Sequence, residues 1–301
     1  MIDTVMKNLL PFLFVLFFHF SPAQEFVANY DESKIPDYTL PDLLKTKKGQ
    51  TVKSAEQWEN VRRSEILNDF KTHVYGRIPQ QDVEVEIKKG KEVDVFDGKA
   101  WMKEVTMSFT RDGRSVSMDI LMFVPKGSYP SPMFVSLNFY GNHTILNHPY
   151  ISLPKSWIRN NEGFNITENK AADASRGVRE SRWPVEMIIG RGYGLATIYY
   201  GDIDPDKNDF SDGIHALFYE QGQKKPADDA WGSITAWSWG LSRAMDYFEM
   251  DDHIDASKIA LMGHSRLGKT SLWAGALDQR FAIVISNDSG CGGAALSRRR
   301  I

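Results

Sequence analysis

The sequence is poor in cysteine, since Cys291 is the only one among 301 residues. A single thiol excludes a disulfide within the chain and a cysteine-rich zinc site, so packing has to supply the stability. A basic surplus is missing as well, because 36 Lys and Arg stand against 39 Asp and Glu and the net charge is −3. We therefore expect no nucleic-acid partner, which would need a basic stripe. The chain does hold 42% hydrophobic residues, enough for one large core or two smaller ones.

A membrane-spanning run is also absent. The apolar run Leu9–Phe18 falls well short of the ~20 residues needed to cross a bilayer. Lys7 precedes it, and the small residues Ser21 and Ala23 follow at the spacing that a signal peptidase reads. The pattern predicts a signal peptide over residues 1–23, a secreted or periplasmic protein, and no membrane segment after its removal.

Residues 24–99 are predicted to form an amino-terminal extension, punctuated by prolines, that packs on a main domain over residues 100–301. Within the extension, apolar residues between positions 55 and 74 recur at three- and four-residue spacings. This periodicity predicts one helix.

The remaining chain changes from neighbouring strands to alternating strands and helices. Strands are predicted over residues 83–87, 100–109, 115–124 and 133–139, with turn signals such as Asp112-Gly113 between them. Helices are then predicted over 185–190, 229–248 and 266–277, and strands over 194–200, 258–262 and 281–286. The first set indicates early antiparallel strands. The second predicts an α/β fold with a parallel sheet covered on both faces.

The most informative segment is the strand-to-helix turn at Ser265. A buried apolar strand leads into Gly263-His264-Ser265, and a helix starts at once. Such a turn exposes the serine hydroxyl at the amino end of the helix, where free N–H groups favour a developing oxyanion. The pattern predicts a nucleophilic serine, with a serine that only caps the helix as the alternative.

The segment Gly263-His264-Ser265-Arg266-Leu267-Gly268-Lys269 resembles the Gly-x-Ser-Arg-x-Gly-Lys signature of the glucuronoyl esterases, a carbohydrate-esterase family. It departs from the usual hydrolase pattern because Leu267 occupies the position of the second glycine. The segments Asn138–His143, Tyr199–Pro205 and Asn287–Ala295 are also similar to the family. The resemblance implies an α/β-hydrolase three-layer sandwich, truncated before the last strands.

The same resemblance implies four roles. Ser265 would attack the ester carbonyl of a glucuronic acid residue, and Arg266 would stabilise the oxyanion. Lys269 would bind sugar hydroxyls, and Asp288 would orient the catalytic histidine. Without the resemblance, Arg266 and Lys269 are typical of solvated helix charges and Asp288 of a turn or cap. Cys291, flanked by glycines, is predicted to be a buried structural thiol.

A histidine after Ser265 is missing, although hydrolases of this kind order their triad as serine, acid, histidine. His143, on the loop after an early strand, is predicted to be a structural hydrogen-bonding residue. We therefore expect an amino-terminal fragment that lacks the histidine region. Residues 24–301 alone are expected to be inactive on esters and poorly soluble, because the last strand would leave an apolar sheet edge.

No metal or cofactor is predicted. Asp202, Asp204, Asp206 and Asp209 superficially resemble a calcium loop, but Pro205 interrupts it and no glutamate closes the frame. An acidic loop at the carboxyl end of a strand is more typical of the wall of a site.

The resemblance to the glucuronoyl esterases implies a serine esterase that cleaves the ester between 4-O-methyl-glucuronic acid of xylan and an alcohol of lignin. The expected partner is thus a glucuronoxylan or lignin–carbohydrate ester. Two alternatives stay open: an acetyl-xylan or other carbohydrate acyl esterase, and a non-catalytic carbohydrate-binding relative. The interpretation fails if the Ser265 hydroxyl lies away from any cleft or if the Arg266 guanidinium is fixed elsewhere.

Overall fold

The computed structural model describes residues 30–127 and 129–296, and the chain divides after Tyr38 into two units. The described part of the first unit holds a short 3-10 helix, η1 (Glu32–Lys34), capped by the side chain of Asp31. The predicted signal peptide lies outside the described residues. Among those that are described, no helix is long and apolar enough to cross a membrane. The elements below belong to the second unit.

The helix predicted over 55–74 is confirmed. It runs through α1 (Ala55–Gln57), a π-helical turn η2 (Trp58–Arg62) and α2 (Arg63–His73). Ser54 caps it by accepting a hydrogen bond from the Gln57 N–H at 3.1 Å. α2 contacts α6 (Arg266–Leu277): the Arg63 guanidinium donates a hydrogen bond to the Ala276 carbonyl at 2.7 Å. The helix within the predicted extension is thus hydrogen-bonded to the helix that follows Ser265.

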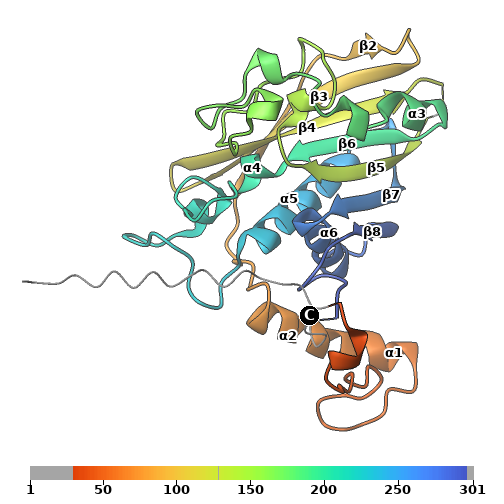
Figure 1. Ribbon diagram of the computed structural model, residues 1–301, viewed down its shortest axis with the longest axis vertical. Coiled ribbons are helices and arrows are strands. Elements are labelled where there is room, and N and C mark those ends of the chain that lie inside the picture. Colours follow the sequence, from red (N-terminus) through yellow and green to blue (C-terminus); the bar gives the residue numbers. More distant parts are fainter. Residues whose placement is uncertain (1–29, 128, 297–301) are drawn as a thin grey trace, which may run out of the picture. The chain divides into compact units, whose positions relative to one another are not determined.

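An eight-stranded sheet forms the centre of the described part of this unit, in the order β1-β3-β4-β6-β5-β7-β8 with β2 paired to β3 (Figure 1). The strands are β1 (Glu84–Lys89), β2 (Val93–Val95), β3 (Ala100–Arg111), β4 (Arg114–Pro125), β5 (Ser131–Asn138), β6 (Gly194–Tyr199), β7 (Ile254–His264) and β8 (Ile283–Asn287). From β1 to β6 the neighbours in the sheet are antiparallel, whereas β6, β5, β7 and β8 are parallel.

Two strand predictions need correction. The sequence predicts an antiparallel strand over residues 133–139, but β5 pairs in parallel with both β6 and β7. A long excursion over residues 139–184 separates β5 from the helix before β6, and a crossover of that kind is what a parallel pair needs. The short strand β2 was not predicted. The hairpin turn at Asp112-Gly113 is confirmed, with both residues at positive φ, as a two-residue turn requires.

Helices cover the two faces of the sheet unequally. On one face α5 (Ser233–Phe248) and α6 pack over β7 and β8, and they enclose the main hydrophobic core. On the other, α3 (Val185–Gly190) packs on β4 and β6. The helix predicted over 229–248 begins at Ser233 instead, because the Asp229 carbonyl and the Trp231 N–H bond the backbone of Arg77.

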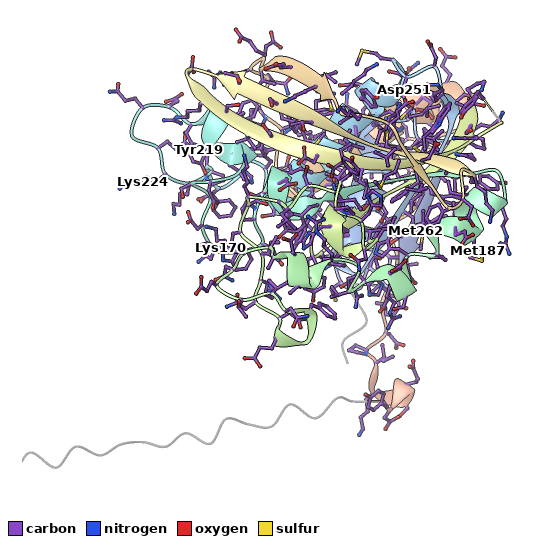
Figure 2. All side chains as sticks on the ribbon, turned by 90° about the horizontal axis from the view of Figure 1, so that it is seen from above. Lys170, Met187, Tyr219, Lys224, Asp251 and Met262 are labelled. Carbon is purple, nitrogen blue, oxygen red and sulfur yellow. The ribbon has the colours of Figure 1, made fainter. Side chains whose placement is uncertain are left out.

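The prediction of a sheet covered on both faces is wrong for one region of the described chain. Beside α3 a cavity of about 480 Å³ opens over β5 and β7, lined by Phe134, Met187 and Met262 among others. Met187 and Met262 lie near each other in Figure 2. Met262 is 39% exposed, and Ile283 on the edge strand β8 is 58% exposed. The part of this face over β7 and β8 is therefore apolar, and no helix covers it among the residues that the structure describes.

Candidate active site

Ser265 is the single residue between β7 and α6, and its backbone conformation is one that non-glycine residues rarely adopt. Its φ and ψ are 56° and −128°. The surroundings hold it there, because its N–H donates to the Asn287 carbonyl at 2.9 Å and its own carbonyl accepts from the Gly268 N–H at 2.8 Å. The half-buried Ser265 therefore sits at the amino end of a twelve-residue helix, beside N–H groups that have no partner inside the helix.

Two glycines make this turn possible. A Cβ on Gly263 would lie 2.1 Å from the Leu267 carbonyl oxygen, and one on Gly268 would lie 2.9 Å from the Asn287 carbonyl oxygen. Gly268 thus provides the close approach of α6 to β8, one position later than in the usual hydrolase pattern. Leu267, which takes the usual glycine position, is buried in the core.

Arg266 is the first residue of α6, and its guanidinium is engaged. Its Nη1 donates to Oδ2 of Asp206, while the side chain remains 38% exposed. The same oxygen accepts from the Tyr200 hydroxyl at 3.0 Å and from Nη2 of Arg159 at 3.1 Å. Because Asp206 follows β6, the guanidinium is held at the carboxyl edge of the parallel strands, the edge on which Ser265 stands.

Lys269 and Asp288 both lie near the turn at Ser265. Within the described chain their side chains do not contact each other through a hydrogen bond or an ion pair. Lys269 is half-buried one turn into α6, and Asp288 is exposed directly after β8 at a φ of 51°. Within the described chain neither side chain has an ion pair or hydrogen bond. Their predicted roles stay predictions.

The described histidines do not reach Ser265. These are His73, His143, His148, His215, His253 and His264, and none of them is hydrogen-bonded to the serine within the described chain. His143 is fully buried with Nε2 2.7 Å from the Ser175 hydroxyl, and burial lowers its pKa to about 4. This matches the predicted structural role. His264 is exposed, next to the Asn287 amide at 3.0 Å.

Cys291 corrects another prediction. It is exposed rather than a buried structural thiol. It lies in the turn after β8, between Gly290 and Gly292, which both take positive φ.

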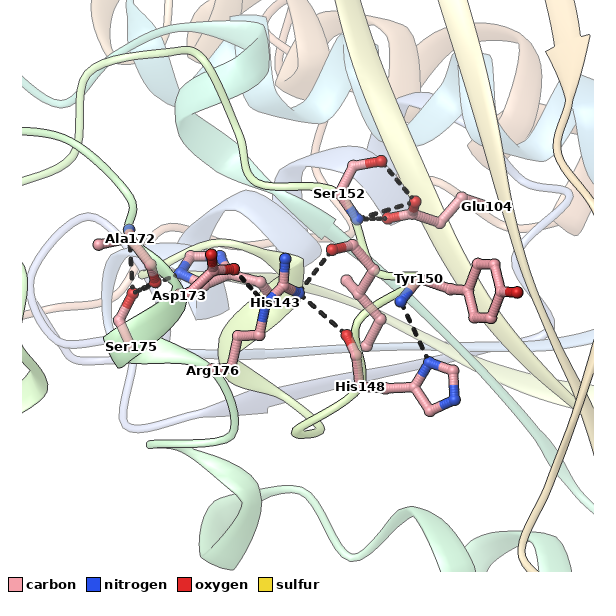
Figure 3. Close-up of polar contacts among 10 residues, drawn as sticks. Glu104, His143, His148, Tyr150, Ser152, Ala172, Asp173, Ser175 and Arg176 are labelled. Carbon is pink, nitrogen blue, oxygen red and sulfur yellow. Dashed lines mark hydrogen bonds and ion pairs between the residues drawn. The ribbon is translucent and has the colours of Figure 1, made fainter.

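The excursion over residues 139–184 is fastened by hydrogen bonds from the partly buried side chains of Glu104 and Arg176 (Figure 3). Glu104 of β3 accepts from the backbone N–H of Ser152 at 3.0 Å and from its hydroxyl at 2.8 Å. Nη1 of Arg176 donates to the carbonyls of His148 at 2.9 Å and Ile151 at 2.6 Å. The excursion also carries Arg159, so its fixed course determines where that second guanidinium meets Asp206.

The four aspartates compared with a calcium loop have separate partners. Asp202 accepts from the Ser156 hydroxyl at 2.5 Å, and burial raises the pKa of Asp202 to about 7. Asp204 is buried beside His215, Asp206 binds Arg266, and Asp209 pairs with Lys207. Sequence reasoning placed this loop in the wall of a site but missed the contact of Asp206 with Arg266. The acidic composition was the only signal for it.

The strand order and the strand–serine–helix turn are those of an α/β-hydrolase. A family model described as "Glucuronyl esterase, fungi" matches residues 185–300. Carbohydrate esterase MZ0003, from an unknown prokaryotic organism, is 51% identical over 279 residues, which are 92% of this chain and 65% of that relative. A solved structure of a promiscuous CE15 esterase from a marine bacterial metagenome is 51% identical with a TM-score of 0.82, and the match covers 90% of this chain and 68% of that one.

The chain belongs to carbohydrate esterase family 15, the glucuronoyl esterases. A fungal relative, the 4-O-methyl-glucuronoyl methylesterase of Schizophyllum commune, is 26% identical over 278 residues, and the match covers 90% of this chain. The chain spans 65% of the MZ0003 esterase and 54% of the fungal enzyme.

Proposed function

We propose that the protein is a serine esterase for 4-O-methyl-glucuronoyl esters, which join glucuronic acid on xylan to lignin alcohols. The observation that carries this proposal is the strained Ser265 at the amino end of α6, followed directly by a partly exposed arginine. The family supports the substrate class, since the named activity of the fungal relative is that of a 4-O-methyl-glucuronoyl methylesterase.

In the proposed reaction, Ser265 Oγ attacks the ester carbonyl, the C–O bond to the alcohol breaks, and the alcohol leaves with a proton. Water then hydrolyses the acyl-serine and releases the uronate. The Arg266 N–H and guanidinium stabilise the oxyanion, a contribution of about 3–4 kcal/mol for one well-placed donor. Lys269 binds sugar hydroxyls, and Asp288 orients the histidine that removes the serine proton.

We further propose that this histidine lies in a part of the family's chain that these 301 residues do not span. Among the described histidines, His143 and His215 are fully buried, and none contacts Ser265. Without a base a serine keeps an ordinary alcohol pKa and is a weak nucleophile. Secretion after removal of residues 1–23, with glucuronoxylan as the partner, completes the proposal.

The test is hydrolysis of benzyl D-glucuronate by the protein expressed with the coding sequence that follows codon 301, alongside residues 24–301 alone. We expect turnover only with the longer chain, and a loss of at least about a thousandfold in Ser265→Ala. Ser257→Ala, at an exposed serine of β7, is the matched control and should keep full activity. Equal turnover in Ser265→Ala would refute the nucleophile, and no turnover by any form would favour a carbohydrate-binding relative.

A second candidate is a carbohydrate acyl esterase of wider scope, such as an acetyl-xylan esterase. The solved relative at 51% identity is described as promiscuous, which favours this alternative. Arg266 and Lys269 argue against it, since an acetyl group has no ring hydroxyls beside its carbonyl. Comparable rates of hydrolysis of acetylated xylan and of the glucuronate ester would show that the protein is a carbohydrate acyl esterase of wider scope.

A further inference from the structure

Asp206 collects three donors on one oxygen at the edge of the candidate site. Its Oδ2 accepts from Arg266 Nη1, from the Tyr200 hydroxyl at 3.0 Å and from Arg159 Nη2 at 3.1 Å. The Asp206 side chain is 20% exposed, so the ion pair to Arg266 is shielded on one side only. Sixty residues separate Asp206 from Arg266 in the chain, and thus the contact exists only in the folded state.

Tyr200 connects this carboxylate to the core. The Tyr200 ring is buried and lies 4.8 Å from the ring of Trp237 and 5.5 Å from that of Phe139, centroid to centroid. Burial and the nearby charge of Asp206 raise the pKa of the Tyr200 hydroxyl, so it stays protonated and donates throughout the physiological range. The position of Asp206 is therefore fixed by a side chain that cannot swing away.

The loop that carries Asp206 is also fixed from the inside. Trp237 Nε1 of α5 donates to the Asp204 carbonyl at 2.8 Å. The buried His215 ring lies 3.6 Å from Asp204 Oδ2, and a Cβ on Gly213 would come within 2.4 Å of Asp204 Oδ1. These contacts leave the backbone next to Asp206 with little freedom.

The charges in this cluster do not cancel. Two guanidinium groups share a single carboxylate, and Arg159 is 56% exposed while Arg266 is 38% exposed. Of the Arg266 nitrogens, only Nη1 has a side-chain partner among the residues described. Asp206 therefore does not use all the donors and positive charge of the two arginines.

We propose that Asp206 is a positioning residue: it sets the orientation of the Arg266 guanidinium before substrate arrives and acts on catalysis only through that arginine. This inference rests on the proposed esterase function. Preorganised donors cost no rearrangement when charge develops, whereas a free arginine side chain would have to be ordered at that moment.

The first test is kinetic and uses the active form of the enzyme with benzyl D-glucuronate. Asp206→Asn keeps the size of the side chain but removes its charge, and we expect kcat to fall about ten- to a hundredfold while KM changes less than about threefold. Asp209→Asn, in the same loop and bound to Lys207 and Ser211 among the described residues, is the control and should retain the wild-type kcat. In Arg266→Gln, the further change Asp206→Asn should cost nothing more, because the two act as a unit. Additive losses would overturn the proposal.

The second test does not depend on activity. When an ion pair stops rotation about the Cζ–Nε bond, the two Nη groups of an arginine give separate ¹⁵N resonances, and a free guanidinium gives one averaged signal. We expect separate Arg266 signals, assigned by their loss in Arg266→Gln, in the wild type and in Asp209→Asn, and one averaged signal in Asp206→Asn. Separate signals in all three proteins would refute the role of Asp206. A wild type that hydrolyses no ester would refute the proposed function instead, and this second test would still decide on Asp206.

Discussion

Two aspartate clusters lie at opposite edges of the parallel strands and differ in how deeply they are buried. In each, a tyrosine hydroxyl and a cationic side chain donate to the aspartate. Asp251, before β7, accepts from Lys103 Nζ at 2.7 Å and from the Tyr247 hydroxyl at 2.5 Å, and the two charged side chains are 3% and 7% exposed. Asp206, after β6, likewise has a tyrosine and cationic partners, but its two arginines, Arg266 and Arg159, are 38% and 56% exposed.

The difference shows how burial separates a structural charge cluster from one that a ligand can use. Both oxygens of Asp251 are satisfied, since Oδ1 accepts from the His253 N–H at 3.1 Å. Burial alone would raise the pKa of Asp251, but the hydrogen bonds from Lys103 and Tyr247 outweigh it and hold the pKa at about 2. The Asp251 cluster is closed off from solvent, whereas the Asp206 cluster has donors left over at the protein surface.

The sharpest way to test this comparison is to remove the cation from the buried cluster. Lys103→Met leaves the Asp251 charge buried without its partner, and we expect a loss of about 3–5 kcal/mol in the free energy of unfolding, measured by urea titration. Lys258→Met is the control, because that lysine is 67% exposed in its pair with Asp255. A loss below about 1 kcal/mol in Lys103→Met would show that burial does not set the strength of the Asp251 cluster.

A smaller effect is expected from pH, and its sign differs between carboxylates. The pKa of Asp202 is raised by burial to about 7, above the ~3.9 of an unfolded aspartate. The folded state then binds a proton that the unfolded state has released, so the free energy of unfolding should fall as pH rises from about 4 to 7. The stabilisation from Asp251 has the opposite sign: it is present above pH ~4 and is lost as pH falls through 2.

Asp202→Asn isolates the contribution of Asp202 to the pH dependence of the free energy of unfolding. Relative to wild type, we expect this variant to gain on the order of 2 kcal/mol between pH 4 and 7, since an amide does not titrate. Urea titrations at pH 4.5, 6 and 7.5 measure the gain, and Asp209→Asn, an exposed carboxylate of the same loop, should show none of it. A parallel pH dependence in wild type and Asp202→Asn would assign the proton to another group.

The sequence predicts local elements here much better than contacts between them. The bounds of α6 and the turn at Ser265 follow from periodicity and glycine spacing within a dozen residues, and both are as predicted. The parallel direction of β5 was missed because it depends on the path of the whole 139–184 excursion. The Arg266–Asp206 pair joins the first residue of α6 to the loop after β6, and no spacing rule connects positions so far apart. Sequence reasoning therefore supplied the candidate nucleophile, while the arrangement around its arginine required the fold.

The smallest expected effect is the contribution of the Asp206 cluster to the free energy of unfolding. Asp206→Asn should lower the free energy of unfolding by less than about 1 kcal/mol, because a partly exposed ion pair gains little over hydration of its two charges. The same urea titration used for Lys103→Met measures it. The contrast matters more than either number: the buried cluster should govern stability without changing the reaction, and the exposed one should govern kcat with little change in stability. If Asp206→Asn lost as much stability as Lys103→Met, the two clusters would be alike, and Asp206 would hold the fold rather than the arginine.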